Sequence, residues 1–300
     1  MILKHFCSSE LFPRQSSTSP SCSVLSFDFR SLSFPRFPIS LGRSLLRISK
    51  MADFDFSRAE NNFDDIMKEM DEEMESLNRK YTEIVVIRHG ETEWNADGRI
   101  QGHLDVELND TGRRQAAAVA ERLSKEPTIS AVYSSDLKRA YNTAEIIASR
   151  CGGLQVIKDP DLRERQLGDL QGLTLTEAAK TNVEAYNAIK SSKRDKEIPG
   201  GGESLDQLYQ RCTMALRNIA SEHKGERIVV VTHGGVIRSF HGLVSSSHGW
   251  SAGKILNTSV NIFHLSHKGK WTIKTWGDVS HLEQTTAVLE SGFGGDKLSG

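Results

Sequence analysis

The chain has 300 residues, which is long enough for one large domain, or two small ones, with a buried core. A hydrophobic content of 37% excludes a disordered chain, and no apolar run approaches the roughly 20 residues that a membrane-spanning helix needs. The formal net charge of −1 provides no basic field, so we expect neither a nucleic-acid nor a membrane partner.

Four cysteines are spread along the chain without a CxxC pair: Cys7, Cys22, Cys151 and Cys212. This spacing excludes a zinc ribbon and argues against a disulfide framework. The cysteines therefore favour a reducing compartment.

Charge divides the chain into three parts. Residues 1–50 carry a net charge of +5, residues 52–80 carry −6, and the remainder is balanced. The first part is rich in serine and arginine, poor in acids, and lacks the continuous apolar core of a secretory signal. This composition is typical of an organelle transit peptide, so we expect a chloroplast location. In the alternative, translation starts at Met51 and the protein is cytoplasmic.

Residues 51–80 form the acidic part. Within it, apolar residues recur at helical spacing on one face: Phe63, Ile66, Met67, Met70, Met74 and Leu77. The pattern predicts an amphipathic helix over residues 59–80. This helix either packs on the main domain, residues 81–300, or binds a partner.

The main domain alternates between strand and helix patterns. Short apolar runs rich in β-branched residues are typical of buried parallel strands, and they occur at residues 83–89, 129–134, 154–157 and 227–232. Apolar stripes at helical spacing lie between and after them, over residues 116–123, 137–148, 174–190 and 205–219. Two further β-rich runs, at residues 259–265 and 271–276, predict a hairpin. The alternation predicts an α/β fold with a mostly parallel sheet covered on both faces.

Two of the predicted strands end in a histidine followed by a glycine. His89-Gly90 follows the first apolar run, and His233-Gly234 follows the clearest buried strand in the chain. Glycine lets the backbone turn sharply and lets a ligand approach closely. Because active residues in parallel sheets gather at the carboxyl ends of strands, we expect the two histidines to face each other across one pocket.

The stretch Arg88-His89-Gly90-Glu91-Thr92 resembles the signature of the histidine phosphatase superfamily, also called phosphoglycerate mutase-like. Further blocks resemble that family in its order, at residues 98–103, 133–140, 162–165, 201–204 and 232–235. The resemblance covers about two thirds of the chain, from residue 81 to residue 281. It implies a three-layer α/β sandwich with a mostly parallel central sheet, helices on both faces and a small helical cap.

The resemblance also implies a catalytic role for several residues. His89 is expected to be the nucleophile, which forms a phosphohistidine that water then hydrolyses. Its imidazole must be neutral to attack, so an acceptor such as a backbone carbonyl has to hold one ring nitrogen. Arg88 and Arg139 suit fork-shaped contacts with phosphoryl oxygens. His233 is expected to be a cationic donor to the same oxygens.

Glu164 is expected to protonate the leaving oxygen and then to take a proton from water. Lesser contacts with the substrate are expected from Asn95, Gln101, Gly102 and Gly234. Each of these residues, taken alone, has an ordinary structural explanation; Glu164, for example, lies in a charge run typical of a surface. The proposed pocket therefore depends on the family's blocks occurring together and in order.

Other polar motifs do not indicate a second site. The histidines near the C-terminus, His264, His267 and His281, are too scattered for a metal site, and no carboxylate cluster suggests magnesium. We therefore predict no metal and no cofactor. Residues 200–202 are three glycines without the Lys-Ser/Thr of a P-loop, and they predict a flexible hinge. His241 and His248 are expected in an exposed loop.

The predicted function is a metal-independent phosphatase acting on small phosphorylated metabolites. Mutases of the resembled family carry a longer insertion after the acid, whereas about 38 residues separate Glu164 from Glu203 here. A shorter cap leaves a wetter site, which favours hydrolysis. Two alternatives remain, a phosphoglycerate mutase with the same pocket and a non-catalytic relative that binds phosphorylated ligands. The absence of GxGxxG after the first strand argues against a dinucleotide-binding protein.

Overall fold

The computed structural model describes residues 81–245 and 252–282. The predicted leader over residues 1–50 and the predicted acidic helix within residues 51–80 lie outside the described residues. In the described part, no helix is both long enough and apolar enough to cross a membrane.

A six-stranded sheet forms the centre of the fold, in the order β3-β2-β4-β1-β5-β6. The four strands β1 to β4 run parallel to one another, whereas β5 is antiparallel to β1 and β6 is antiparallel to β5. Their bounds are Tyr81–Arg88 (β1), Ala131–Ser134 (β2), Val156–Lys158 (β3), Arg227–Thr232 (β4), Val260–Ser266 (β5) and Trp271–Asp278 (β6). β1 and β4 are central neighbours, and Arg88 is paired with Thr232. The histidines that follow these two residues therefore start from adjacent positions.

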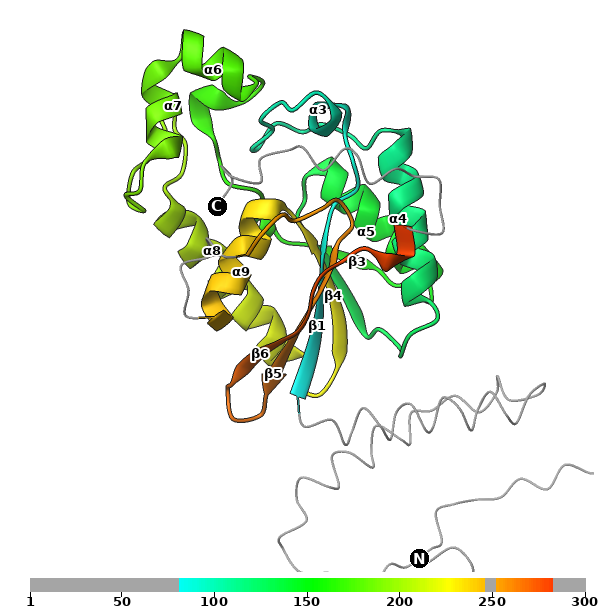
Figure 1. Ribbon diagram of the computed structural model, residues 1–300. Coiled ribbons are helices and arrows are strands. Elements are labelled where there is room, and N and C mark those ends of the chain that lie inside the picture. Colours follow the sequence, from blue (N-terminus) through cyan, green and yellow to red (C-terminus); the bar gives the residue numbers. More distant parts are fainter. Residues whose placement is uncertain (1–80, 246–251, 283–300) are drawn as a thin grey trace, which may run out of the picture. The chain divides into compact units, whose positions relative to one another are not determined.

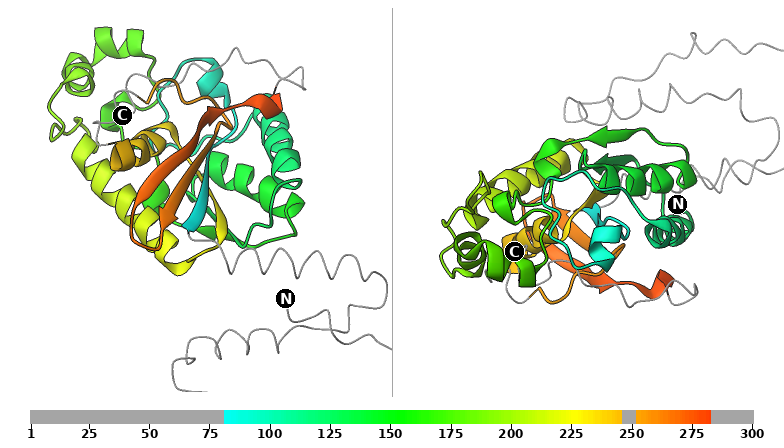
Figure 2. Two further views of the ribbon diagram at one scale, coloured as in Figure 1. Left: turned by 60° about the horizontal axis from the view of Figure 1, so that its bottom comes forward. Right: turned by 90° about the horizontal axis from the view of Figure 1, so that it is seen from above.

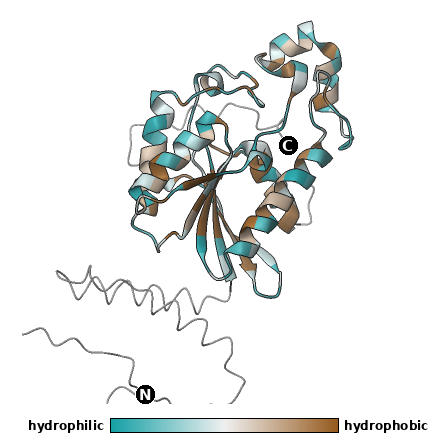
Figure 3. Cartoon of the chain, turned by 180° about the vertical axis from the view of Figure 1, so that it is seen from behind, coloured by the Kyte–Doolittle hydropathy of each residue, from teal (hydrophilic) through white to brown (hydrophobic). Residues whose placement is uncertain are grey.

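Helices cover both faces of the sheet (Figures 1 and 2). α4 (Asp110–Leu123) and α5 (Lys138–Arg150) pack on one face, and α8 (Leu205–Glu222) and α9 (Gly234–Ser245) pack on the other. Successive strand residues point to opposite faces, so β1 serves both cores. Ile84 and Val86 join the α8–α9 core, whereas Val85 and Ile87 join the α4–α5 core. The central strands β1 and β4 are accordingly apolar on both faces (Figure 3).

A small helical cap has a core of its own. It comprises the short turn η5 (Gly168–Leu170), α6 (Leu175–Thr181) and α7 (Val183–Lys190). Its buried residues are Ile100, Leu167, Leu170, Ala178, Ala185, Ala188, Ile189 and Ile198. Figure 1 shows α6 and α7 beside the N-terminal end of α8, away from the β5–β6 hairpin. The three-layer architecture predicted from the sequence is thus confirmed, including the helical region over residues 174–190.

Polar side chains cap the N-termini of α4 and α8. The predicted capping box at the start of α8 is present, because Ser204 Oγ accepts from Gln207 N at 3.1 Å and Gln207 Oε1 accepts from Ser204 N at 2.8 Å. Asn109 caps α4 in a similar way, accepting from Gly112 N at 2.7 Å. Each cap satisfies amide groups that the first helical turn leaves without a partner.

The structure differs from the sequence analysis at three places. The helix α3 (Glu93–Ala96) was not predicted, because four residues are too few to show a helical period. His241 lies within α9 rather than in an exposed loop. The predicted hinge is a tight turn, in which Gly202 N donates to Ile198 O at 2.8 Å. A side chain at Gly200 would collide with Asp169, so this turn is packed against η5.

The close contact between Gly112 and the backbone of Glu91 should contribute to the stability of the fold. A Cβ atom at Gly112 would lie 2.0 Å from the carbonyl oxygen of Glu91. Gly112→Ala normally favours a helix, but here the overlap should lower the free energy of unfolding by about 1–3 kcal/mol. Urea denaturation measures the change, with Asn218→Ala at an exposed position of α8 as the control. An unchanged or increased stability of Gly112→Ala would show that this contact is loose.

Candidate active site

The carboxyl ends of β1 and β4 bring the two histidines together. The ring centroids of His89 and His233 are 5.1 Å apart, with the rings inclined by 58°. Both side chains are buried, with 3% and 0% of their surfaces exposed. The structure therefore shows the facing arrangement that the two His-Gly turns predict.

His89 is held in one tautomer by its own turn. Its Nδ1 atom lies 2.7 Å from the carbonyl oxygen of Gly90, which can only accept, so Nδ1 carries the hydrogen. Nε2 is then left as the unprotonated nitrogen. Burial lowers the pKa of His89 well below its ordinary value, and the charges of Arg139 and Arg88 lower it further. The ring is therefore neutral, and Nε2 has a free electron pair, as a nucleophile requires.

Two arginines provide positive charge beside this imidazole. The guanidinium of Arg139 is almost fully buried and donates to the carbonyls of Leu104, at 2.9 Å, and Gly102, at 2.7 Å. Burial lowers the pKa of Arg139 to about 10, which leaves the group charged at neutral pH. Arg88 Nη1 donates to the carbonyl of Ile255 at 2.5 Å. The carbonyl partners of Arg139 hold its fork in place without cancelling its charge, so the site favours an anion.

His233, expected to be a cationic donor to a bound phosphoryl group, is neutral when the site holds no ligand. Burial lowers the pKa of His233 well below its ordinary value, and the charges of Arg139, His89 and Arg88 act in the same direction. Its Nε2 atom lies 2.9 Å from the hydroxyl of Ser135. In the ligand-free site His233 is therefore neutral. Only a bound anion that offsets the two arginines would favour its protonation.

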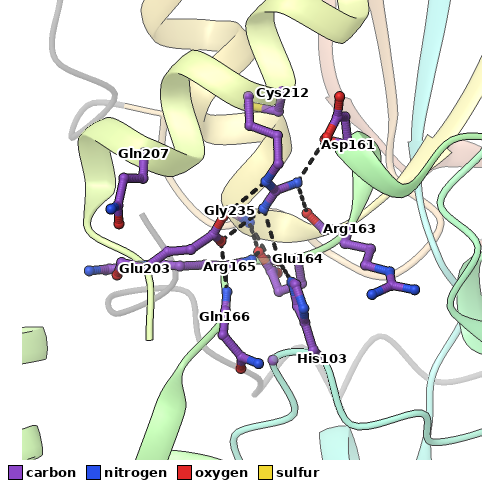
Figure 4. Close-up of polar contacts among 12 residues, drawn as sticks. His103, Asp161, Arg163, Glu164, Arg165, Gln166, Glu203, Gln207, Cys212 and Gly235 are labelled. Carbon is purple, nitrogen blue, oxygen red and sulfur yellow. Dashed lines mark hydrogen bonds and ion pairs between the residues drawn. The ribbon is translucent and has the colours of Figure 1, made fainter. Parts of the chain in front are cut away.

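Glu164 lies against the N-terminus of α9. The amide of Gly235 is 3.2 Å from both carboxylate oxygens of Glu164, and the amide of Arg165 donates to Oε1 at 2.9 Å. Helix N-termini favour negative charge, so this position suits a carboxylate. Because Gly235 is two residues after His233, the carboxylate is placed close to the histidine pair. Figure 4 shows Glu164 next to Gly235.

An ion pair between Arg211 and Glu203 fixes the loop that carries Glu164. Arg211 of α8 pairs with the carboxylate of Glu203 at 2.8 Å and donates to three backbone carbonyls: Asp161, Arg163 and Glu164. His103 Nε2 also lies 2.7 Å from the carbonyl of Glu164. These contacts, drawn in Figure 4, hold the backbone of the loop from both sides. The sequence reasoning did not assign a role to Arg211 or to His103.

The residues expected to make lesser contacts occupy separate positions around the pair. Asn95 is 2% exposed and its Oδ1 accepts from the amide of Thr92, as part of the α3 cap. Gln101 is 8% exposed, and its Oε1 is buried without a partner in the described part of the chain. Gly102 has a positive φ of 55°, and its carbonyl accepts from Arg139. Gly234 is the first residue of α9 and is buried.

The loop before β5 was missed by the sequence reasoning. Asn257 Nδ2 donates to the carbonyl of His89 at 2.9 Å, and the amide of Thr258 donates to the carbonyl of Arg88 at 3.0 Å. Thr258 has a φ of 54° and is the one non-glycine residue with positive φ among the described residues. Such backbone strain persists only where surrounding contacts impose it. The loop therefore orients the backbone of both Arg88 and His89, and no local sequence motif indicates this.

Together these features define a class of protein. It is an α/β protein in which a neutral, buried histidine lies beside two arginines that can bind an anion, and a carboxylate lies near the histidine. In the described ranges, no group of three or more His, Cys, Asp or Glu side chains is arranged to hold a metal ion. The sequence profile of the histidine phosphatase superfamily, branch 1, matches residues 84–279. The chain belongs to this family.

Similar proteins agree with this assignment. Phosphoglycerate mutase-like protein 4 of Arabidopsis thaliana is 66% identical over 220 residues, which cover 73% of this chain and 95% of that protein. The metal-independent phosphoserine phosphatase of the same plant is 55% identical over 215 residues, which cover 72% and 89%. Among solved structures, a mutant phosphoserine phosphatase of Entamoeba histolytica in complex with phosphoserine has a TM-score of 0.59 and 27% identity, and the match covers 67% and 99%.

The protonation state of His89 can be measured directly. Because its pKa is lowered, Nε2 should stay unprotonated, and Nδ1 protonated, when the pH falls from about 7.5 to about 6. NMR of the chain with ¹⁵N-labelled histidine reports both nitrogens, and His89→Gln identifies the signals. A midpoint at or above the ordinary imidazole value would contradict this account of the site.

Proposed function

We propose that this chain is a metal-independent phosphatase that hydrolyses small phosphorylated metabolites through a phosphohistidine on His89. The observation that carries the proposal is the state of His89, which is neutral, buried and positioned with Nε2 unprotonated beside two guanidinium groups. Membership of the histidine phosphatase superfamily supports it independently. The 55% identity to a metal-independent phosphoserine phosphatase supports hydrolysis in particular.

The first step forms the covalent intermediate. The electron pair on His89 Nε2 attacks phosphorus, and the bond between phosphorus and the ester oxygen breaks. The leaving oxygen takes a proton from the carboxyl group of Glu164, so the product is a neutral alcohol. Arg88 and Arg139 bind the non-bridging oxygens and stabilise the charge on the transferring group.

The second step returns the enzyme to its starting state. A water molecule attacks the phosphohistidine and gives a proton to the carboxylate of Glu164, and the bond between phosphorus and Nε2 breaks. Inorganic phosphate leaves, Glu164 is protonated again, and His89 is neutral. The bound phosphoryl group offsets the charges of the arginines, so His233 can take up a proton and donate to a phosphoryl oxygen. Every charge required for this cycle comes from side chains of the chain itself.

Mutase activity is the second candidate, and the similarity to a protein named phosphoglycerate mutase-like supports considering it. A mutase must keep water away from its phosphohistidine and return the phosphoryl group to a bound intermediate. The cap between Glu164 and Glu203 is small, because α6 and α7 have only 7 and 8 residues. A cap of this size favours access of water and therefore hydrolysis.

The experiment that tests the function separates the candidates in one assay. With 3-phosphoglycerate and excess EDTA, the chain should release inorganic phosphate and form no detectable 2-phosphoglycerate. His89→Gln, the control, should lose activity by several orders of magnitude. Faster interconversion than phosphate release would establish a mutase. Binding of phosphorylated ligands without turnover would establish a non-catalytic relative, and activity lost to EDTA but restored by magnesium would overturn the metal-independent mechanism.

The role of Glu164 predicts a dependence on the leaving group. An alkoxide needs a proton as it leaves, whereas para-nitrophenolate is a stable anion. Glu164→Gln should therefore slow phosphoenzyme formation about 10²- to 10⁴-fold on an alkyl ester and much less on para-nitrophenyl phosphate. Single-turnover measurements isolate this step from the later attack by water.

A matched control is available in the cap. Glu177→Gln replaces a glutamate that pairs with Arg99, and it should affect both esters alike. If Glu164→Gln slows both esters equally, Glu164 is not the acid. Glu203 is an unsuitable replacement, since its carboxylate already pairs with Arg211.

A further inference from the structure

The imidazole of His103 holds the backbone of the proposed acid. Its Nε2 atom lies 2.7 Å from the carbonyl oxygen of Glu164, a contact drawn in Figure 4. A carbonyl oxygen can only accept, so Nε2 carries the hydrogen. Burial lowers the pKa of His103 below its ordinary value, so the ring is neutral at neutral pH. The bond to Glu164 therefore comes from one defined tautomer.

The backbone around His103 is held by a different part of the site. The carbonyls of the residues on either side of it, Gly102 and Leu104, accept from the guanidinium of Arg139 at 2.7 and 2.9 Å. The amide of His103 itself donates to Gln171 Oε1, also at 2.7 Å. The ring therefore projects from a segment that is fixed to an arginine of the proposed phosphoryl site.

The other donors to Glu164 come from other elements. Its carboxylate accepts from the amides of Arg165 and Gly235, and its carbonyl oxygen accepts a second, longer bond from Arg211 Nη2, at 3.3 Å. Arg165 is the next residue of the same loop, Gly235 lies in the first turn of α9, and Arg211 lies in α8. Among the described residues, His103 is thus the donor that ties Glu164 to the phosphoryl-binding segment.

Glu164 and Arg139 have to be kept apart. Burial lowers the pKa of Arg139 to about 10, and the charge of Glu164 opposes this decrease, so the two groups attract each other. No ion pair joins them in the described part of the chain. A direct pair would neutralise the guanidinium and hold the carboxylate away from the leaving oxygen. His103 is connected to both, to Arg139 through its backbone neighbours and to Glu164 through its ring, so it sets their separation.

We infer that His103 is a positioning residue, which sets the place of Glu164 relative to a phosphoryl group bound by Arg139. The inference rests on the proposed function, since it takes Glu164 as the acid. A general acid transfers its proton only within hydrogen-bond reach of the ester oxygen. An error of about 1 Å in such a placement can cost roughly 100-fold in rate. His103 thus governs the step in which the leaving oxygen departs, and it does so through Glu164.

The test is a variant whose effect depends on the leaving group. The alkyl ester is the one that the wild-type chain hydrolyses fastest among phosphoserine, 3-phosphoglycerate and glycerol 3-phosphate. His103→Ala should slow phosphoenzyme formation roughly 10- to 100-fold on this ester, and much less on para-nitrophenyl phosphate, which needs little help from the acid. His103→Gln, whose side-chain amide can still donate to the carbonyl of Glu164, should restore most of the rate. A merely structural role of His103 would slow both esters alike. Rapid-quench measurement of single turnovers gives both rates.

A double variant shows whether His103 acts through Glu164. In the Glu164→Gln background, His103→Ala should cause little further loss on the alkyl ester, because the side chain that it positions can no longer give up a proton. Residues that act through one another show such non-additivity. If the two losses multiply in full, His103 acts elsewhere and the inference is wrong.

Two controls identify the other ways in which the variant could lose activity. His267→Ala removes a histidine from the exposed turn after β5, at the end of β1 away from His89, and it should leave both rates unchanged. Inorganic phosphate should inhibit His103→Ala and the wild-type chain equally, because Arg139 contacts backbone carbonyls rather than the imidazole. Weaker inhibition, together with an equal loss on both esters, would show that His103 acts through Arg139 and would overturn the inference.

The outcomes distinguish this inference from the proposed function. If the wild-type chain hydrolyses the alkyl ester and His103→Ala slows alkyl and aryl esters by the same factor, the function stands and the inference fails. If the phosphohistidine transfers its phosphoryl group to a bound intermediate instead of water, hydrolysis fails as the function, while a leaving-group effect of His103→Ala still supports the inference. If no ester forms a phosphoenzyme with the wild-type chain, both fail.

Discussion

The central constraint on this fold is the burial of two guanidinium charges beside two imidazoles. Both donate to backbone carbonyls, Arg88 to that of Ile255 and Arg139 to those of Leu104 and Gly102, and a carbonyl holds a guanidinium without neutralising it. Their field, together with burial, keeps His89 and His233 neutral. The same field that makes His89 a nucleophile also attracts the phosphate that it attacks. The ligand-free site therefore stores an electrostatic imbalance that substrate binding relieves.

The surrounding structure serves to maintain that imbalance. The backbone beside both arginines turns sharply, at Gly102 with its φ of 55° and in the loop at Thr258 with its φ of 54°. The amide of Gly235 holds the carboxylate of Glu164, and among the described residues no ion pair joins Glu164 to Arg139. A carboxylate bound directly to Arg139 would cancel the charge that the phosphate requires. Glu164 must therefore meet two requirements: it has to reach the leaving oxygen, and it must not pair with Arg139.

Much of this arrangement was predictable from sequence, and the limits have physical causes. Continuous β-branched runs identified β1 and β4, and the glycine after each histidine marked where these strands end. The length of α3 and the strained turn at Thr258 could not be inferred, since neither produces a periodic pattern. The neutral state of His233 in the ligand-free site could not be inferred, because burial and the field of two arginines are properties of the assembled fold. Residues 1–80 are not described, so the transit peptide, the chloroplast location and the acidic helix stay predictions.

The pairing of Arg88 with Thr232 has a consequence for how the site comes into being. β1 is made early in synthesis, but its neighbours in the sheet, β4 and β5, come from the other end of the domain. Asn257 and Thr258, which hold the backbone of β1's last residue and of His89, also come from that end, just before β5. No early fragment of the chain can therefore form the phosphate site, however much of its helical structure is present. Activity appears only when the two ends of the domain have met, so it reports completed folding rather than partial assembly.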